Sequence, residues 1–491
     1  MGRPREVQLN APLWFYFACS ALALAAGMLV VSFPRATGKD SVLAAILLLG
    51  TICLAPALLL RMSKVGPGFI YGLSTFVNIG LGSLAWVSIP AFATPGLDQR
   101  AIAGALLTLV AGMAAFWVGY VLAHPPREVR PERPVAIVPA WVLLALFGVG
   151  LAAIGILFVT GRFGYSAIFA RGDVLWWEQW VQTVTGLTGI AIIAAALHAF
   201  GNKSKTHQWA LLVMVVVSCG VGFVGGFKSA VLLPLALTLF VFYYYRRRLP
   251  RKVLAAAVLL PLVLVPANLA YRGAIRTGSG ATSVGSVVGT VGRTSARSFD
   301  SSLDDRITST TLWSSQRFRT IESVAQIKAL TPSRIPYLGV ESYAQIPAIT
   351  LLPRLLWPGK PTGGEGVLFG RTYFGASFDS RSSYAVTNMG DLYMHSGPWG
   401  VAVGMVIWGA VAGLLFRWLW RRQSPSALLV YVVALFQMTQ VELDFTALIS
   451  GAFRAVVLAW VVGRVLYGPM PIRSPSQSAE DSEARQRLRP P

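Results

Sequence analysis

The sequence predicts an all-α polytopic integral membrane protein with about 12 transmembrane helices and one large extracytoplasmic loop. Of its 491 residues, 55% are hydrophobic and only 13% are charged, whereas a soluble globular chain has about 25% charged residues. The mean hydropathy is +0.60. Apolar runs of about 20 residues recur along the chain, and each is long enough to cross a hydrocarbon core of roughly 30 Å.

Twelve spans follow from these apolar runs. In chain order they are Ala11–Phe33, Ser41–Leu60, Gly68–Phe92, Ala101–Ala123, Val135–Thr160, Val181–Phe200, Trp209–Gly225, Ser229–Tyr245, Val253–Tyr271, Gly397–Leu419, Pro425–Val441 and Phe445–Tyr467. We find no internal repeat in the sequence, so an inverted-repeat transporter has no positive support.

Positive charge dominates, with 42 Lys and Arg residues against 20 Asp and Glu residues and a net charge of +22. In a membrane protein, Lys and Arg collect in cytoplasmic loops as topology signals, so this excess does not indicate nucleic-acid binding. Both termini are therefore predicted to lie in the cytoplasm. The cations fall in alternate connecting segments: Arg3/Arg5, Arg61/Lys64, Arg127/Arg130/Arg133, Lys203/Lys205, Arg246 to Lys252, and Arg417/Arg421/Arg422.

The same alternation places the long polar segment Tyr271–Trp399 outside the cytoplasm. The chain then divides into an N-terminal membrane bundle of about nine helices (1–271), an extracytoplasmic loop (272–396), C-terminal membrane helices (397–467) and a polar cytoplasmic tail (468–491). We expect the tail to be disordered, because it is rich in Pro, Ser and charged residues. The three cysteines all lie in apolar runs, which suggests neither a disulfide framework nor a metal site.

Two short outer segments carry cations beside glycine. Arg171 lies in RFGYSAIFARGDVLWWEQW and is followed by Gly172 and Asp173. Lys228 lies in VGFVGGFKSAVLLP, in a tight turn between two spans. Glycines there allow close backbone approach, and amide and hydroxyl donors beside a charge suit a diphosphate. The alternative for Lys228 is a lysine that only reaches out to the membrane interface.

The long loop carries two further clusters of cations. At its start, Arg272 and Arg276 share one helical face, and guanidinium groups can bind a diphosphate bidentately. Further on, PRLLWPGKPTGGEGVLFGR is too rich in proline and glycine for a long regular helix, so we expect a rigid, shaped segment. Its candidates and those of the following segment are Arg354, Trp357, Lys360, Glu365, Arg371, Arg381, Asp391, Tyr393 and His395.

PRLLWPGKP, the glycine-rich stretch after it and TNMGDLYMHSGPWGVAVG together resemble the C-terminal region of bacterial O-antigen polymerases, the oligosaccharide repeat-unit polymerases of the Wzy type. Members commonly show a Pro-Arg…Trp-Pro-x-Lys-Pro segment, then a Gly-Asp/Glu-x-Tyr…Gly…Gly segment that enters a late membrane helix. Ala170–Asp173 and Gly226–Ser229 fit this group more weakly. The span count and the large outer loop agree across the whole chain. The resemblance supports the family, but not a sugar specificity.

This resemblance implies a GT-C-like glycosyltransferase in the bacterial cytoplasmic (inner) membrane. It would join undecaprenyl-diphosphate-linked oligosaccharide repeat units on the outer face, with no metal and no other cofactor. A hydroxyl of the incoming unit would attack the anomeric carbon of the growing chain, and lipid diphosphate would leave. The expected partners are these lipid-linked oligosaccharides, the bilayer, and a chain-length regulator and flippase of the same pathway.

The candidate residues divide by role. Arginine and lysine can stabilise the departing diphosphate by preorganised electrostatics, and Arg272, Arg276 and Arg354 are the catalytic candidates for this. Glu365, Asp391 or His395 would accept the hydroxyl proton. The predicted substrate-binding residues are Lys228, Arg171, Lys360, Arg371, Arg381, Trp357 and Tyr393.

Three other functions stay open. A different polyprenyl-phosphate-sugar glycosyltransferase would usually hold a metal with acidic residues in an early outer loop. An O-antigen ligase, which transfers glycan to another acceptor, is not separated from a polymerase by motif. A transporter predicts ionisable residues along a path at mid-bilayer, where we find little beyond Arg454, with Glu442 and Asp444 at the preceding turn. An ion pair between Arg454 and one of these acids would be structural.

Overall fold

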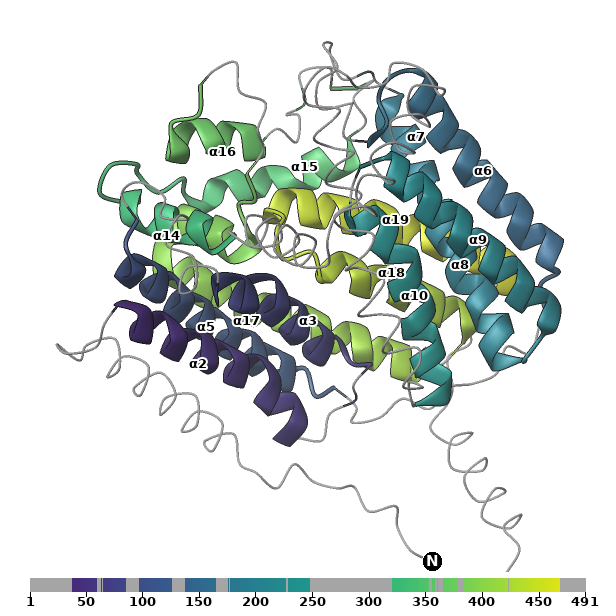
Figure 1. Ribbon diagram of the computed structural model, residues 1–491, viewed down its shortest axis with the longest axis horizontal. Helices are drawn as coiled ribbons and strands as arrows, with labels where there is room; N and C mark the ends of the chain where they lie inside the picture. Colours follow the sequence, from purple (N-terminus) through teal and green to yellow (C-terminus); the bar gives the residue numbers. More distant parts are fainter. Residues whose placement is uncertain are drawn as a thin grey trace, which may run out of the picture.

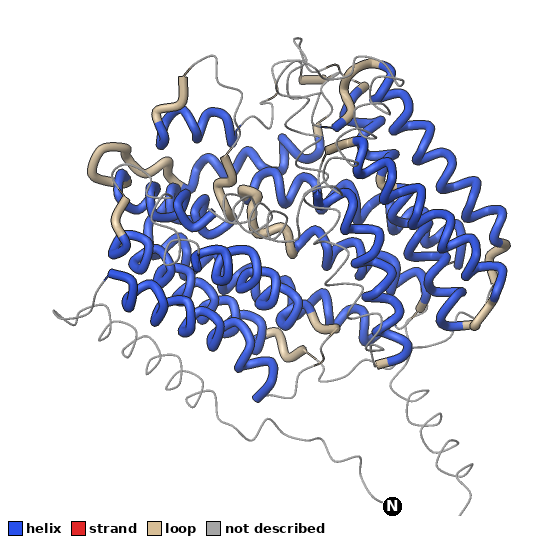
Figure 2. Tube along the Cα trace, viewed as in Figure 1, coloured by secondary structure: helices blue, strands red, loops and turns tan. Residues whose placement is uncertain are grey.

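The computed structural model describes residues 38–59, 63, 65–84, 97–125, 137–164, 175, 177–226, 228–247, 320–352, 356–357, 360, 365–377, 384–422 and 424–468. For residues 58, 59, 228 and 365 only the backbone is described. All regular elements in this part of the chain are helices, which confirms the predicted all-α class (Figures 1 and 2).

In chain order, the helical elements have the following bounds. They are α2 (Gly38–Leu59), α3 (Pro67–Thr75), η1 (Phe76–Leu81), η2 (Gly82–Leu84), α5 (Gln99–Leu122), α6 (Ala140–Val159), α7 (Glu178–Thr185), α8 (Leu187–Ala196), η5 (Leu197–Gly201), α9 (Lys205–Val224), α10 (Lys228–Arg246), α14 (Thr320–Leu330), η6 (Val340–Gln345), α15 (Ile346–Leu351), α16 (Glu365–Phe374), α17 (Asn388–Arg422), α18 (Pro425–Met438) and α19 (Phe445–Tyr467).

Eight stretches of the described chain are long and apolar enough to cross a membrane. Among the other predicted spans, Ala11–Phe33 and Val253–Tyr271 lie outside the described residues. The predicted span Gly68–Phe92 corresponds to α3, η1 and η2, and Pro425–Val441 corresponds to α18, which is apolar but shorter. Eight candidate spans are therefore shown, and the total of about 12 stays a prediction.

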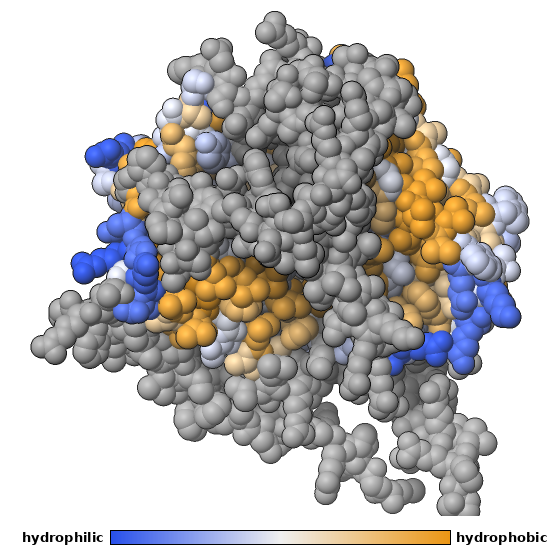
Figure 3. Space-filling view, in the orientation of Figure 1, coloured by the Kyte–Doolittle hydropathy of each residue, from blue (hydrophilic) through white to orange (hydrophobic). Residues whose placement is uncertain are grey.

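Buried apolar side chains form two clusters. One joins α2, α5, α14 and the first part of α17, and the other joins α6, α8, α9, α10, α18 and the far ends of α17 and α19. Because α17 contributes to both, it links the two halves of the bundle (Figure 1). Apolar side chains also cover the outer flank where α6 and α9 lie, as Figure 3 shows. Such a surface suits contact with lipid better than contact with water.

Helices α5 and α17 pack backbone against backbone. A Cβ at Gly119 would overlap the carbonyl oxygen of Val406, and a Cβ at Gly409 would overlap that of Phe116. Small residues at such contacts let membrane helices approach closely, and packing then holds them together without a hydrophobic driving force. The position of α17, which carries the candidate site, therefore depends on these glycines.

Short polar side chains fix where several helices begin. Asp98, Ser424 and Asp444 accept hydrogen bonds from the backbone N–H groups of Ala101 (2.7 Å), Ala427 (3.2 Å) and Ala447 (2.7 Å), at the starts of α5, α18 and α19. Thr387 does the same for α17, because its Oγ1 accepts from Gly390 N at 2.9 Å. These caps satisfy N–H groups that have no partner within the helix.

The described part of the long loop packs against one end of the bundle. Lys328 of α14 donates from Nζ to Gly104 O (2.9 Å) and Thr108 Oγ1 (3.2 Å) of α5, and burial lowers the pKa of its ammonium group. Tyr373 of α16 shares a 2.8 Å hydrogen bond with Thr331, and burial raises the pKa of its phenol. We call this end, where α5 begins, the site end. The starts of α17 and α19 lie deeper in the bundle, because Met389 reaches Gly112 in the middle of α5 and the Phe445 ring packs on Trp408.

Candidate functional site

The first part of α17 is a short buried helical segment, Asn388–His395. A break separates it from the long membrane helix, because Ser396 and Gly397 have non-helical backbone angles. Gly397 has φ 63° and ψ −149°, a conformation open almost only to glycine, and a Cβ there would lie 2.6 Å from the Tyr337 hydroxyl. The predicted polar loop therefore ends in a helix that lies within the protein. After the break, the first turns of the span pack back against this helix, because a Cβ at Gly400 or Gly404 would overlap Leu392.

Backbone hydrogen bonds hold both ends of this segment. Thr387 N donates to Glu442 O (3.3 Å) and Asn388 N to Val441 O (3.2 Å), at its start. At its end, Leu338 N donates to Met394 O (3.0 Å) and Gly339 N to His395 O (3.2 Å). The turn between α18 and α19 thus encloses one end of the segment, and the stretch before η6 caps the other.

Asp391 lies at the centre of this enclosure and is 3% exposed. Its Oδ2 accepts hydrogen bonds from the backbone N–H of Phe445 (3.0 Å) and from the Tyr343 hydroxyl (3.1 Å). Phe445 is the first residue of α19, so the carboxylate also meets the positive end of that helix dipole. These contacts join α17, η6 and α19 at a single buried carboxyl group.

His395 lies one helical turn after Asp391 and contacts it twice. Its Nδ1 is 2.8 Å from Asp391 O and 3.4 Å from Asp391 Oδ1. A carbonyl oxygen can only accept, so Nδ1 carries the proton. In the neutral ring Nε2 then has a free lone pair, and it has no hydrogen-bond partner among the described residues. The Tyr343 ring stacks on the imidazole at 4.1 Å and 25°, which fixes its plane.

This arrangement can perform base chemistry. One ring nitrogen is held in a defined tautomer, the carboxylate of Asp391 can stabilise an imidazolium, and the second nitrogen remains able to accept a proton. Within the described residues, no three His, Cys, Asp or Glu side chains are grouped as a metal site would require.

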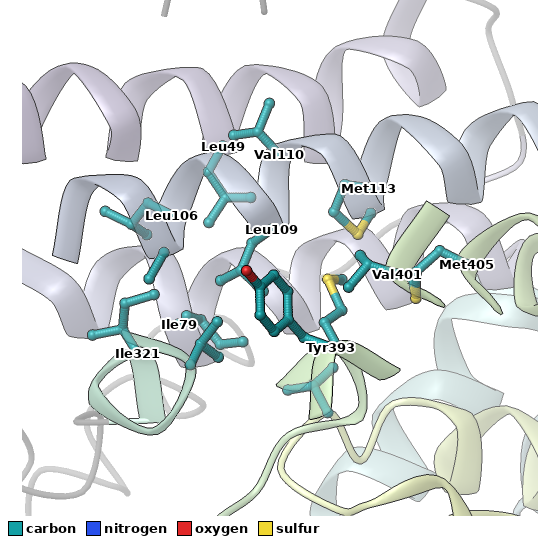
Figure 4. Packing of buried hydrophobic residues seen from close by; sticks show 14 of the residues in the cluster. Leu49, Ile79, Leu106, Leu109, Val110, Met113, Ile321, Tyr393, Val401 and Met405 are labelled. Carbon is teal, nitrogen blue, oxygen red and sulfur yellow. The ribbon is translucent and has the colours of Figure 1, made fainter. Parts of the chain in front are cut away.

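Two other residues of the segment, Asn388 and Tyr393, are packed in the protein interior. Asn388 donates from Nδ2 to the Tyr71 hydroxyl at 2.7 Å. Tyr393, a predicted substrate-binding residue, is 7% exposed and belongs to the same apolar cluster as Leu109, Met113 and Met405 (Figure 4). These contacts indicate that Tyr393 stabilises the packing of α17 on α5.

The described residues of the proline-rich segment form a compact turn. Lys360 is 5% exposed, and its Nζ donates to Leu352 O at 2.9 Å while its backbone N donates to Trp357 O at 3.0 Å. Trp357 and Arg371, which lies in the last turn of α16, are half-buried. The lysine thus holds the described residues of this segment near the end of α15.

Several predicted site residues are not placed. Lys228 begins α10 and Glu365 begins α16, and only their backbones are described. The predicted residues that lie outside the described residues are Arg171, Arg272, Arg276, Arg354 and Arg381.

Two of the predicted outer segments do meet. Gly164, after α6, packs directly against Gly225, just before Lys228, and the Phe163 ring lies beside the same glycine. Arg162 pairs with Glu178 across this loop at 2.5 Å. The turn that carries Lys228 therefore adjoins the loop that carries Arg171.

Tyr343 is a site residue that the sequence does not predict. It lies in VESYAQ, where no motif or periodic pattern distinguishes it. Its role depends on contacts with Asp391 and His395, which lie about fifty residues later in the chain. A tyrosine beside several polar residues in an outer loop was the only signal that could have indicated it.

Comparison with known families gives one result. The family described as Domain of unknown function (DUF8712) matches residues 153–466, which is more than half of the chain and includes α17, α18 and the whole described candidate site. The chain belongs to DUF8712. No curated protein matches the chain, and no solved structure matches it. Because the description of DUF8712 gives no activity, it neither supports nor contradicts the resemblance to O-antigen polymerases.

Proposed function

We propose that this DUF8712 protein is a membrane glycosyltransferase that joins undecaprenyl-diphosphate-linked oligosaccharide repeat units. The observation that carries the proposal is the Asp391–His395 pair. Nδ1 of the imidazole is hydrogen-bonded to Asp391, and Nε2 has a lone pair with no partner among the described residues. The pair lies within an apolar helical bundle, toward its site end, and belongs to a long predicted loop that carries many arginines. A base near a lipid surface and a cationic loop suits a lipid-linked anionic substrate.

In the proposed reaction, a sugar hydroxyl of the incoming repeat unit loses its proton to Nε2 of His395. Its oxygen forms a bond to the anomeric carbon of the growing chain as the bond from that carbon to the lipid diphosphate breaks. The diphosphate leaves with the bonding electron pair, and the imidazolium later releases the proton to water. Asp391 would stabilise the imidazolium, because its Oδ1 lies 3.4 Å from Nδ1.

The departing diphosphate requires positive charge close to it. We assign this role to Arg272, Arg276 and Arg354, and we assign substrate binding to Lys228, Arg171, Lys360, Arg371, Arg381 and Trp357. Glu365 remains a second candidate for the base. Cationic side chains can neutralise a diphosphate without a metal, provided that they are held in place before the reaction. The compact turn around Lys360 supports such preorganisation.

We further propose that the site end faces away from the cytoplasm, in the cytoplasmic membrane of a bacterium. Support comes from the charges at the opposite end, where α10 and α17 finish. Arg246, Arg247, Arg421 and Arg422 gather there, as expected of cytoplasmic helix ends. A cysteine in place of Ser424, between α17 and α18, should react with a membrane-impermeant maleimide only after cells are opened. Labelling in intact cells would contradict this orientation.

The decisive experiment is reconstitution of the purified protein in liposomes with defined lipid-linked repeat units. We expect long glycans in the presence of chelator, and none from the His395→Ala protein. Transfer of one glycan to a different acceptor, without chain growth, would favour a ligase. Loss of activity with chelator would favour a metal-dependent glycosyltransferase, and movement of the lipid-linked unit without transfer would favour a transporter.

A further inference from the structure

Arg454 is an ionisable residue inside a candidate membrane span. It lies in the half of α19 nearer to the site end and is half-buried. An arginine at the centre of a membrane helix costs about 2.5–3.5 kcal/mol, so such residues are usually kept for a specific interaction. Among the described residues, no carboxylate pairs with Arg454, so the expected ion pair with Glu442 or Asp444 is not found.

The side chain of Arg454 points toward the site end. Its Nε donates to Ser450 O at 3.1 Å, one turn earlier in α19, which is the direction that helix side chains favour. A guanidinium group has five N–H donors in one plane. Its two terminal nitrogens, with four of these donors, have no partner among the described residues. The two terminal nitrogens of Arg454, which have no partner among the described residues, therefore lie in one plane and can donate to a ligand beside this part of α19.

Polar groups from two other elements lie beside the turn of α19 that precedes Arg454. The Ser450 hydroxyl shares a 2.9 Å hydrogen bond with Thr350 of α15. Among the described residues, a Cβ at Gly451 would meet only the Gln437 side-chain oxygen, at 3.8 Å. The Lys360 ammonium binds Leu352 O, two residues after Thr350 in the chain. A second cation thus lies just beyond the end of α15.

The surface beside Arg454 indicates a lipid ligand. Phe453, Val457 and Trp460 on the adjacent face of α19 are 43%, 41% and 45% exposed. Apolar side chains exposed on a candidate membrane helix face acyl chains. A ligand that reaches the guanidinium from this side would therefore carry a hydrocarbon chain as well as an acidic group.

We propose that Arg454 binds a phosphate group of a polyprenyl diphosphate beside the contact between α15 and α19. This inference rests on the proposed function, because it names the part of the lipid-linked donor that is held there. The free guanidinium nitrogens match a phosphate bidentately, which an ammonium group cannot do. Lys360 contributes a second positive charge, and the polyprenyl chain lies along the exposed apolar face of α19.

Binding of geranylgeranyl diphosphate to the purified full-length protein in detergent tests this proposal. We expect Arg454→Gln to weaken binding at least about tenfold, the usual scale for loss of a charge-assisted hydrogen-bonded contact. Arg454→Lys should give an intermediate loss, because it keeps the charge and loses the planar pair of donors. Arg421→Gln is the control, since Arg421 is exposed in the last turn of α17, at the opposite end of the bundle. Its affinity should equal that of the wild type.

Thermal unfolding in the same detergent shows whether each variant is folded. Equal affinity of folded wild type and Arg454→Gln would overturn the proposal. So would equally strong competition by phosphatidylglycerol, which would show a site for any anionic headgroup, or by free inorganic diphosphate, which would show that the lipid chain is not recognised. If the wild type binds through Arg454 but joins no repeat units, the polymerase proposal fails and the phosphate site stands. If it joins units and Arg454→Gln binds normally, only the phosphate site fails.

Discussion

Buried histidines lie near both ends of α19, and their surroundings differ. His395 lies near the start of the helix, and His198 and His207 lie near its end. At the site end, Asp391 binds Phe445 N, at the start of the helix, and orients His395. At the other end, His198 is 3.2 Å from the hydroxyl of Tyr467, the last residue of the helix. A helix of this length spans about 33 Å, at about 1.5 Å per residue. The two groups are therefore separate sites.

The difference lies in whether an unbonded ring nitrogen is accessible and whether a carboxyl group lies beside the ring. Both nitrogens of His207 are used, because Nε2 donates to Val138 O (2.8 Å) and Nδ1 contacts Ser204 Oγ (2.8 Å). His198 packs on His207 at 4.8 Å between ring centroids and is 0% exposed, so no substrate reaches it. His395 is 8% exposed and keeps one nitrogen unbonded among the described residues. An unbonded nitrogen alone does not mark a candidate base, because Nδ1 of the fully buried His198 also has no partner among the described residues. His395 differs in being partly exposed and in lying beside the carboxyl group of Asp391.

Replacing a histidine at each end gives the largest expected contrast. His395→Ala should lower the rate of glycan joining by about 10²–10⁴-fold, the usual contribution of a general base. His198→Ala should leave the rate per folded molecule unchanged, although it removes buried contacts. Rates are measured in liposomes and normalised to folded protein. Equal losses of rate in both variants would contradict the assignment of the base to His395.

The break in α17 should be sensitive to substitution. Gly397→Ala should lower the free energy of unfolding by about 2–3 kcal/mol, because it combines a strained backbone with a contact to Tyr337. Gly375→Ala is the control, since Gly375 has φ 61° but a Cβ there would have no atom within 4 Å. It should cost about 1–2 kcal/mol from backbone strain alone. Thermal unfolding in detergent gives the difference in stability between the two variants. Equal destabilisation by Gly397→Ala and Gly375→Ala would show that the contact with Tyr337 contributes nothing.

Loss of the carboxylate charge should have a smaller effect on activity than loss of the imidazole. Asp391→Asn keeps the backbone carbonyl that fixes the His395 tautomer and removes only the charge beside Nδ1, so we expect about a tenfold lower rate, or ~1.4 kcal/mol. Asp444→Asn should change little, because asparagine also caps helices well. A loss from Asp391→Asn as large as that from His395→Ala would show that the carboxylate itself is the base.

The smallest expected effect comes from the hydroxyl of Tyr343. Tyr343→Phe removes its hydrogen bond to Asp391 and keeps the stacking on His395, so we expect a two- to fivefold lower rate, or about 0.5–1 kcal/mol. Tyr467→Phe, which removes the contact with His198 at the opposite end, should not change the rate. A larger loss from Tyr467→Phe than from Tyr343→Phe would contradict the assignment of chemistry to the site end.

Local pattern predicted much of the helical architecture. Apolar runs correspond to helices such as α5, α6, α9 and α19 at nearly the predicted positions. The predicted span Gly397–Leu419 corresponds to the part of α17 after the break. The helical segment before it, Asn388–His395, was not predicted, because it contains polar residues and is followed by Gly397 and Pro398. Hydropathy places such a segment in a loop, whereas hydrogen bonds from Leu338 and Gly339 allow it to form a buried helix. These partners come from distant parts of the chain and leave no periodic signal in the segment itself.

The sequence alone determined the all-helical class, the candidate spans and the residue types at the candidate site, because hydropathy and ionisable side chains are properties of local sequence. It also singled out Asp391 and His395 as candidates for the base. Only the tertiary structure decided that Asp391 meets Phe445 N and Tyr343, and that His395 keeps a free nitrogen. The physical reason is that a side chain's chemistry depends on the donors and acceptors around it, and these come from helices far apart in the chain.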